Sequence, residues 1–422
     1  MMNIKTVFRA LRHKNYRLFF SGQSISLIGT WMQQIAVSWL VYRMTNSAFL
    51  LGLVGFSSQI MTFLLAPLAG VIADRHHRHR LLLITQSLAM LQAVVLYLLF
   101  MTHTIAVWHI ILLSLFLGAV NAFDIPVRQS FTVDMITDRV DLSNAIALNS
   151  SMVNAARLIG PSIGGVLIAL FGEGTCFLVN ALSYIAVLFS LTMMKLPPFE
   201  RSSQHRGSVM LQFKEGFLYT LNFMPIRTIL MLLSVISLVA GGVQALMPVF
   251  ARDIFHGNSK TLGLLMAASG LGALTGAIFL AGRKNVLGLS KIIAYSAGLF
   301  GLGTVIFSHV SILIIGMVVL LFSGFGMMVQ MASSNIILQT IVEEDKRGRV
   351  MSFYTMAFMG LSPFGSLFSG VLAVKIGANN TLLWGGVFCI IAAAMFALQL
   401  TKLRGFVRPV YIKKGIIVEH VQ

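Results

Sequence analysis

Apolar residues form long runs along nearly the whole chain, separated by short polar segments. Each run is about 20 residues or longer, which is the length that an α-helix needs to cross ~30 Å of hydrocarbon. We predict twelve spans, at residues 17–43, 48–73, 81–101, 107–128, 144–170, 176–194, 226–251, 260–282, 288–308, 310–335, 351–374 and 381–401. The pattern therefore predicts an all-α integral membrane protein.

The longest polar interruption contains Pro197 and Pro198 and continues into an amphipathic stretch from Val209. Such a segment is typical of a linker followed by a helix lying on the membrane surface. It divides the spans into two blocks of six. We predict an N-terminal six-helix bundle over 1–194, a cytoplasmic linker with an amphipathic helix over 195–225, a C-terminal six-helix bundle over 226–402 and a cytoplasmic tail over 403–422.

The two blocks repeat each other weakly. At an offset of 206 residues, Gly118 matches Gly324 and Gly164 matches Gly370. Repeated halves of six spans are an arrangement that transporters use, with substrate bound near the midplane between the halves. The repeat favours two pseudo-symmetric bundles.

Basic residues determine the expected orientation. The chain carries 31 Lys and Arg against 13 Asp and Glu, a formal net charge of +18. With both termini in the cytoplasm, 26 of those 31 basic residues fall on the cytoplasmic side, as the positive-inside rule requires. The charge therefore indicates a multi-pass protein of a bacterial inner (plasma) membrane that contacts anionic lipid, and no nucleic-acid partner is expected.

Chemistry of other kinds has no sequence signal. Only 10% of the residues are charged, against about 25% in soluble domains. Cys176 and Cys389 both lie in predicted spans and fit no metal site or disulfide framework. No phosphate-binding loop and no nucleophile–base pair stand out. We expect no enzyme activity, no metal and no cofactor.

An arginine lies inside the fifth predicted span. Placing a charge in hydrocarbon costs roughly 3 kcal/mol, so Arg157 indicates a functional site. Asn154 lies on the same helix face, which should line a cavity or the bundle interior. Two interpretations stay open: contact with an anionic group of a transported molecule or coupling to a carboxylate, and a structural ion pair or hydrogen-bond centre.

Asp124 is the most deeply placed carboxylate, near the end of the fourth span. It shares a helix face with Asn121 and Arg128. A carboxyl group that is partly desolvated holds a proton more readily, so Asp124 is a candidate for proton coupling. The alternative is a salt bridge to Arg128 or to Arg75.

Uncharged polar residues in other spans are further candidates for a cavity that binds substrate. They are Gln34 in the first span, Gln244 in the seventh and Gln330 in the tenth. The alternative for each is a helix–helix hydrogen bond.

The segment Gly70-Val-Ile-Ala-Asp74-Arg75-His-His-Arg78-His-Arg80 resembles the loop signature of the major facilitator superfamily. His77 replaces its usual second glycine. The resemblance implies a conformational switch comprising Gly70, Asp74, Arg75 and Arg78, in which Asp74 and Arg75 stabilise the outward-facing state. From the residues alone, a carboxylate here can cap a helix, and the arginines can pair with a carboxylate on a neighbouring helix.

A second motif, Gly160-Pro161-Ser-Ile-Gly164-Gly165, is similar to the fifth-helix signature of exporters and antiporters in that superfamily. Its physical content is a kinked helix with a small-residue face for close packing, and a purely structural role is the alternative. A further run, Thr340-Ile-Val-Glu343-Glu-Asp-Lys-Arg347-Gly348-Arg349-Val-Met-Ser352, leads into the eleventh span. Together with Asp124-x-Pro126-x-Arg128-Gln129 and Ala-Ala-Arg157-x-x-Gly-Pro, it resembles the branch of enterobactin-exporter-like and macrolide-efflux-like proteins. The arginine usual near the start of the fourth span is absent.

This resemblance implies the major facilitator fold, with alternating access of two bundles. It further implies a monomer that exports a small amphipathic molecule, a siderophore or a hydrophobic drug, by proton antiport. The first alternative is an importer of a siderophore, metabolite or lipid-like substrate on the same fold. The second is a membrane receptor or scaffold that transports nothing.

Overall fold

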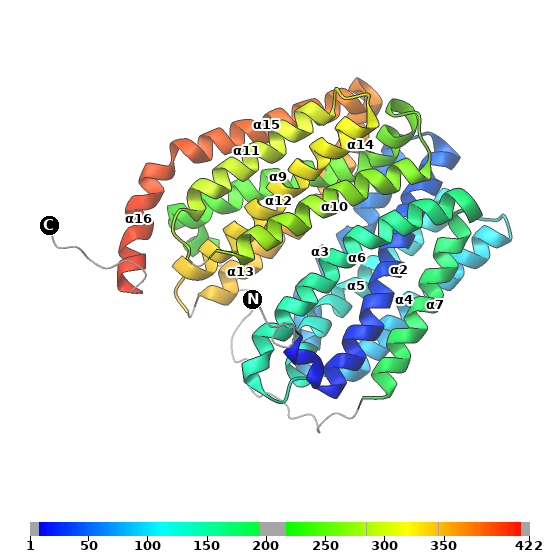
Figure 1. Cartoon of the computed structure of the whole chain (residues 1–422), viewed down its shortest axis with the longest axis horizontal. Coiled ribbons are helices and arrows are strands. Elements are labelled where there is room, and N and C mark those ends of the chain that lie inside the picture. The colour runs from blue at the N-terminus through cyan, green and yellow to red at the C-terminus, as the bar shows by residue number, and fades with distance from the viewer. Residues whose placement is uncertain (1–7, 195–216, 284, 345, 415–422) are drawn as a thin grey trace. The chain divides into compact units, whose positions relative to one another are not determined.

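The computed structural model describes residues 8–194, 217–283, 285–344 and 346–414, and these residues form helices joined by short turns (Figure 1). The chain divides into two compact units. The first unit comprises Met1–Ser203 and Ala245–Gly270, and the second comprises Gln204–Gln244 and Leu271–Gln422. The predicted linker over 195–225 lies largely outside the described residues.

Long helices make up the first unit. In chain order they are η1 (Arg9–Arg12), α2 (Lys14–Thr45), α3 (Ala48–Arg75), α4 (Arg78–Met101), α5 (Val107–Asp134), η2 (Arg139–Asp141), α6 (Leu142–Phe171) and α7 (Glu173–Thr192). α2 packs against α6 and α7, α3 packs against α5, and α4 packs against both α5 and α7. Residues 245–270 add the end of α9 (Met224–Val249), the π-helix η3 (Phe250–Ile254) and the start of α10 (Ser259–Ala281).

The second unit repeats part of this packing. After α10 come α11 (Leu289–Phe307), α12 (Leu313–Ile341), α13 (Arg347–Thr355), the π-helix η4 (Met356–Gly360), α14 (Ser362–Ile376), α15 (Ala378–Leu398) and α16 (Leu400–Lys413). α11 packs against α12 and α15, as α4 packs against α5 and α7. The repeated arrangement bears out the pseudo-symmetry that the glycine matches predicted.

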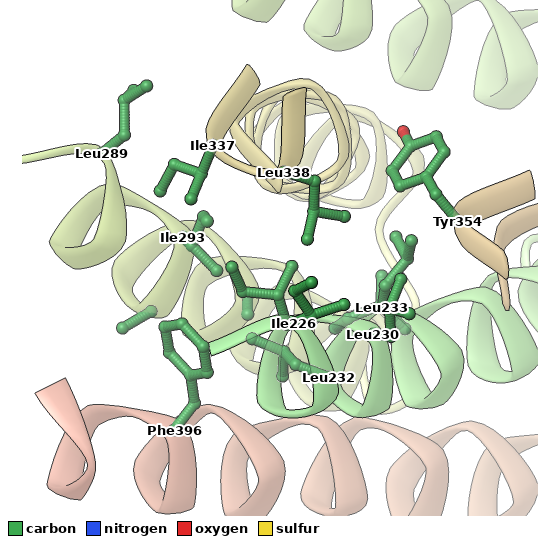
Figure 2. Close-up of a cluster of buried hydrophobic side chains, with 14 of the residues drawn as sticks. Ile226, Leu230, Leu232, Leu233, Leu289, Ile293, Ile337, Leu338, Tyr354 and Phe396 are labelled. Carbon is green, nitrogen blue, oxygen red and sulfur yellow. The ribbon is translucent and has the colours of Figure 1, made fainter. Parts of the chain in front are cut away.

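Apolar side chains fill the interior of the second unit. Figure 2 shows side chains of α9, α11, α12 and α15 meeting there, among them Leu233, Ile293, Leu338 and Phe396. Lipid tails are as apolar as these side chains, so dispersion contacts between closely packed helices stabilise the bundle more than exclusion of water does.

Eleven helices of the described residues are long and apolar enough to cross a membrane. The first predicted span, 17–43, lies within α2, which is not one of the eleven. Gln23, Gln33 and Gln34 make α2 more polar than the others. The predicted eleventh span, 351–374, is built from α13, η4 and α14 and includes a π-helical turn, which commonly marks a functional position.

Single glycines connect two helix pairs at corresponding places in the two units. Gly172 joins α6 to α7 with φ +83°, and Gly377 joins α14 to α15 with φ +84°. Residues with a side chain rarely adopt a positive φ, so glycine permits a one-residue turn at both positions.

The predicted tail over 403–422 begins inside a helix. α16 places Leu403, Val407 and Tyr411 against the core of the second unit, and its remaining side chains are mostly exposed. The spacing of four residues between the buried positions explains why a short amphipathic helix forms there.

Candidate functional site

Close packing of small residues brings α6 against two neighbours. A Cβ atom on Gly160 would lie 2.5 Å from Cβ of Trp31, and one on Gly164 would lie 2.8 Å from Cγ2 of Ile35. On another side, a Cβ on Gly165 would lie 2.6 Å from the carbonyl oxygen of Ser259. The glycines of the motif therefore let α2 and the start of α10 approach the α6 backbone.

The backbone around Pro161 takes part in the same contact. A Cβ atom on Gly263 would lie 2.7 Å from the Pro161 carbonyl oxygen, and the Ser259 hydroxyl donates to the Gly165 carbonyl at 3.0 Å. Pro161 itself lies inside α6 and is buried. The motif thus fixes the position of the helix that carries Arg157.

Among the described residues, Arg157 has an aromatic neighbour and forms no ion pair with an acidic one. Its guanidinium carbon lies 5.7 Å from the ring centroid of Trp31, close enough for a cation–π interaction. None of the ion pairs among the described residues includes Arg157. The described residues therefore supply no structural ion pair for Arg157, which was part of the second interpretation. The half-buried guanidinium keeps donors that an anion would satisfy.

The other candidates on this helix and on α2 are exposed or contact only their own helix. Asn154 is half-buried and donates to the Ser150 carbonyl at 2.9 Å, one turn back on α6. Gln34 is exposed, whereas its neighbour Gln33 is buried. Among the candidates on α2 and α6, Arg157 is the one brought against an aromatic side chain.

Asp124 lies in a compact polar site between α4 and α5, with 5% of its surface exposed. Its Oδ1 accepts from Thr85 Oγ1 at 2.9 Å and from Gln86 Nε2 at 2.7 Å. Its Oδ2 lies 3.6 Å from Nε of Arg128, one turn further along α5. The salt bridge to Arg128 that was the alternative for Asp124 is therefore present. Two neutral donors also bind the carboxylate.

No sequence pattern had singled out Thr85 and Gln86. They are adjacent on α4, so no helical spacing links them to a site, and they lie 39 and 38 residues before Asp124. Asn121, predicted on the same face as Asp124, is half-buried. The packing of α4 on α5 brings these two donors to Asp124, and the sequence alone does not predict that contact.

A chain of buried amides crosses the first unit. Asn180 donates to Gln33 at 2.8 Å, Gln33 donates to Gln92 at 2.9 Å, and Gln92 donates to the Leu113 carbonyl at 3.4 Å. These residues come from four different helices, α7, α2, α4 and α5. Buried amides in an apolar setting need partners, and each amide here meets the next.

The remaining cavity candidates lie in or near the second unit. Gln330 has no exposed surface, and its Nε2 donates to Ser334 Oγ at 3.3 Å while its Oε1 has no partner. Gln244 is half-buried on α9. Gln330 thus forms an internal polar contact of α12.

The predicted switch motif falls at the end of α3 and the start of α4. The side chains of Gly70, Asp74 and Arg75 lie outside the described part of the structure. Arg78 begins α4, and its Nη1 lies 2.9 Å from Oδ1 of Asp134 at the end of α5. An ion pair between a motif arginine and a neighbouring helix is therefore present.

Polar contacts also gather where α2 ends. Tyr42 donates to Asp253 of η3, and Arg252 donates to the Asn46 side chain at 2.5 Å. Arg43 meets Glu173 through two contacts of 2.8 and 3.1 Å. These pairs hold the segment 245–270 and α7 against the end of α2.

Within the described ranges, no group of three or more His, Cys, Asp or Glu residues could hold a metal ion. Cys176 and Cys389 are both free and buried.

Comparison with known proteins identifies relatives that match nearly the whole chain. Residues 5–407 match a family model described as a transmembrane secretion effector. The Staphyloferrin A transporter of Staphylococcus aureus (strain NCTC 8325 / PS 47) is 29% identical and covers 92% of this chain and 97% of its own. The Enterobactin exporter EntS of Citrobacter koseri is 24% identical and covers 96% of each.

Solved structures share the architecture. A bacterial homolog of the human lysosomal transporter Spinster has a TM-score of 0.69 and covers 93% of this chain and 98% of its own. Its sequence identity is 14%, so this likeness establishes the fold alone.

Proposed function

Since this chain belongs to the major facilitator superfamily, whose members are membrane transporters and not enzymes, we propose that it exports a small amphipathic molecule in exchange for protons. The substrate would be a siderophore or a hydrophobic drug, and the anionic siderophore is the better match to the site. The chain would act as a monomer by alternating access of its two bundles, residues 1–194 and 226–402. It would lie in a bacterial plasma membrane with both termini in the cytoplasm.

One observation carries the choice of substrate. Arg157 lies inside a span, against Trp31, and no described carboxylate forms an ion pair with it. A charge in this environment is costly unless a partner of opposite charge arrives. Siderophores bind ferric iron through anionic oxygen donors, and many carry planar or apolar parts that suit an indole ring. Two of the relatives are named for siderophores, staphyloferrin A and enterobactin.

Proton coupling rests on Asp124. Its carboxylate is nearly buried, and it has one loose cationic partner and two neutral donors. A carboxyl group in such a place can exist in a charged and a neutral form, which an antiporter requires. The wild-type protein and Asp124→Asn, compared with and without an imposed pH gradient, test this part. Gradient-driven flux that persists in Asp124→Asn would contradict it.

The substrate proposal is tested by flux into or out of proteoliposomes. Arg157→Ala should reduce the flux of a carboxylate or catecholate siderophore roughly tenfold or more, because a charge-assisted hydrogen bond contributes about 1.5–3 kcal/mol. Arg157→Lys should retain part of the flux, since it keeps the charge. Arg404→Ala is the matched control, because Arg404 is exposed on α16. Unchanged siderophore flux in Arg157→Ala would contradict the assignment.

Direction separates export from the importer alternative. Cells without an exporter accumulate the labelled substrate, whereas cells without an importer contain less of it than wild-type cells. A macrolide in the same panel tests the hydrophobic drug as substrate. A receptor or scaffold would be indicated by an Arg157→Ala variant that keeps full biological activity and by the absence of flux for every ligand.

A further inference from the structure

The hydrogen bonds around Asp124 have an uneven arrangement. Both neutral donors, Thr85 and Gln86, meet the same oxygen, Oδ1, while Oδ2 has the arginine at 3.6 Å. The Gln86 side chain is 4% exposed, and its Oε1 is buried without a partner. A buried acceptor without a donor costs free energy, so its position beside a titratable group calls for an explanation.

Thr85 has a second acceptor within reach. Its hydroxyl lies 2.9 Å from Asp124 Oδ1 and 3.2 Å from the carbonyl oxygen of Leu82 on its own helix. A hydroxyl has one proton and turns freely about its bond. Thr85 therefore donates to the carboxylate in one arrangement and to the helix backbone in the other.

Gln86 also has two arrangements. A half-turn of its amide exchanges Nε2 and Oε1, which lie at nearly equivalent positions. In the first arrangement Nε2 donates to a charged carboxylate. In the second, the Oε1 that now lacks a partner accepts the O–H of a neutral carboxyl group.

We propose that Thr85 and Gln86 form a two-state hydrogen-bond set that stabilises Asp124 both with and without its proton. This inference rests on the proposed proton exchange and names its positioning residues. With the proton absent, both side chains donate to Oδ1. With the proton present on Oδ1, this O–H donates a hydrogen bond to Gln86 Oε1, and Thr85 donates to the Leu82 carbonyl oxygen. Proton uptake then needs two local rotations and no movement of a helix.

The charged neighbourhood is small. On α5, Arg128 faces Oδ2, and on α7 the Tyr184 hydroxyl interacts electrostatically with Asp124 and Arg128. Tyr184 is itself held by Thr30 at 3.4 Å. From α4 the described contacts are the two neutral side chains. Arg128 favours the charged form at all times, whereas Thr85 and Gln86 adjust to either form.

The two side chains should have different, measurable effects. Thr85→Val keeps the shape and removes a donor that only the charged form uses. The pH at which half of Asp124 is protonated should therefore rise by about one pH unit. Gln86→Met removes a partner of both forms, so this midpoint should move less. In the Gln86→Met variant, however, the neutral Asp124 carboxyl group should lose a hydrogen bond.

Infrared difference spectroscopy of the purified full-length protein reads both effects without transport. The carboxyl stretch of protonated Asp124 is identified by its loss in Asp124→Asn. Its amplitude against pH gives the midpoint, and its frequency rises when the group loses hydrogen bonds. Thr85→Val should shift the midpoint and not the frequency, Gln86→Met should shift the frequency, and Thr85→Ser should restore the wild-type midpoint.

Gln92→Met is the matched control, because Gln92 is a buried glutamine of the same helix that contacts Gln33 and Leu113 instead. It should leave midpoint and frequency unchanged. An unmoved frequency in Gln86→Met, or an unmoved midpoint in Thr85→Val, overturns the two-state set while proton exchange at Asp124 stands. If no carboxyl band is lost in Asp124→Asn at any pH, proton exchange itself fails. Thr85→Val remains informative should Gln86→Met not fold.

Discussion

Two adjacent glutamines of α2 have opposite surroundings at the residue scale. Gln33 is 3% exposed and is bonded on both sides, to Asn180 and to Gln92. Gln34 is exposed. Consecutive helix residues lie 100° apart, so one can face the bundle interior while the next points elsewhere. The sequence predicted a polar face through Gln34, but it gave no sign of the amide chain through Gln33, whose partners come from distant helices.

This contrast yields a stability prediction. Gln33→Leu leaves the Asn180 Nδ2 donor and the Gln92 Oε1 acceptor each without the partner that Gln33 supplies. Each buried unsatisfied group costs about 1–3 kcal/mol. Its melting temperature in detergent should fall clearly below that of wild type. Gln34→Leu should melt as wild type does, so it serves as the matched control. Equal melting temperatures for the two variants would show that the amide chain contributes nothing to stability.

At the scale of elements, the glycines of α6 determine how near α2 comes. A Cβ on Gly160 would meet Cβ of Trp31 at 2.5 Å and the Ile28 carbonyl oxygen at 2.9 Å. The motif was recognisable in the sequence because its spacing places small residues along one face of a helix. Which helix it meets was not, since any span could supply the partner surface.

Gly160→Ala should therefore destabilise the protein by about 1–3 kcal/mol, because backbone and side chain must move apart. The control is Gly298→Ala on α11, where a Cβ would meet nothing within 4 Å. Alanine is the better helix former, so Gly298→Ala should be neutral or slightly stabilising. Thermal unfolding of both variants distinguishes a packing contact from a general effect of removing helix glycines.

The N-terminal element η1 is held by a charged group at the start of α6. Asp141 lies 2.8 Å from Nε of Arg12, 3.2 Å from Nε of Arg9 and 3.0 Å from Nε2 of His13. Burial opposes ionisation of this carboxyl group. The His13 hydrogen bond and the charges of Arg12 and Arg9 outweigh burial, so the pKa of Asp141 lies below its usual value.

The direction of that shift predicts a pH dependence. A carboxyl group whose pKa is lower in the folded state stabilises it fully above the unfolded-state pKa, about 4. That contribution is lost as the pH falls through the folded-state pKa. Asp141→Asn should therefore lower the melting temperature at pH 7, and the difference from wild type should shrink below about pH 4. Asp138→Asn, an exposed partner of Arg12, should have the smaller effect.

At the scale of the whole molecule, the repeat predicted the pseudo-symmetry but not the assignment of residues 245–270 to the first unit. That segment joins the first unit through Tyr42–Asp253, Arg252–Asn46 and Ser259–Gly165. Such contacts connect residues far apart in the chain, and hydrophobic periodicity contains no information about them. Local composition determines where long apolar helices form, so eleven of the twelve predicted spans could be recognised in the sequence.

The repeat also exposes an asymmetry between the units. The offset of 206 residues that aligns Gly118 with Gly324 places Gln330 at the position of Asp124 and Ser334 at that of Arg128. Each pair is in contact along its helix, at 3.6 Å for Asp124 and Arg128 and at 3.3 Å for Gln330 and Ser334. The first unit thus has an ionisable pair where the second has a neutral one.

A neutral pair cannot exchange a proton, so this repeat position should provide one proton site per molecule. Gln330→Leu should keep the pH-gradient dependence of transport, and it should not destabilise the protein strongly, since the Gln330 Oε1 already lacks a partner. Asp124→Asn should lose the gradient dependence. Flux measured against opposing substrate gradients gives the balance point, which for one carboxyl site corresponds to one proton per substrate. A balance point that requires two protons, or a Gln330→Leu variant that loses coupling, would place a second proton-exchanging group elsewhere in the fold.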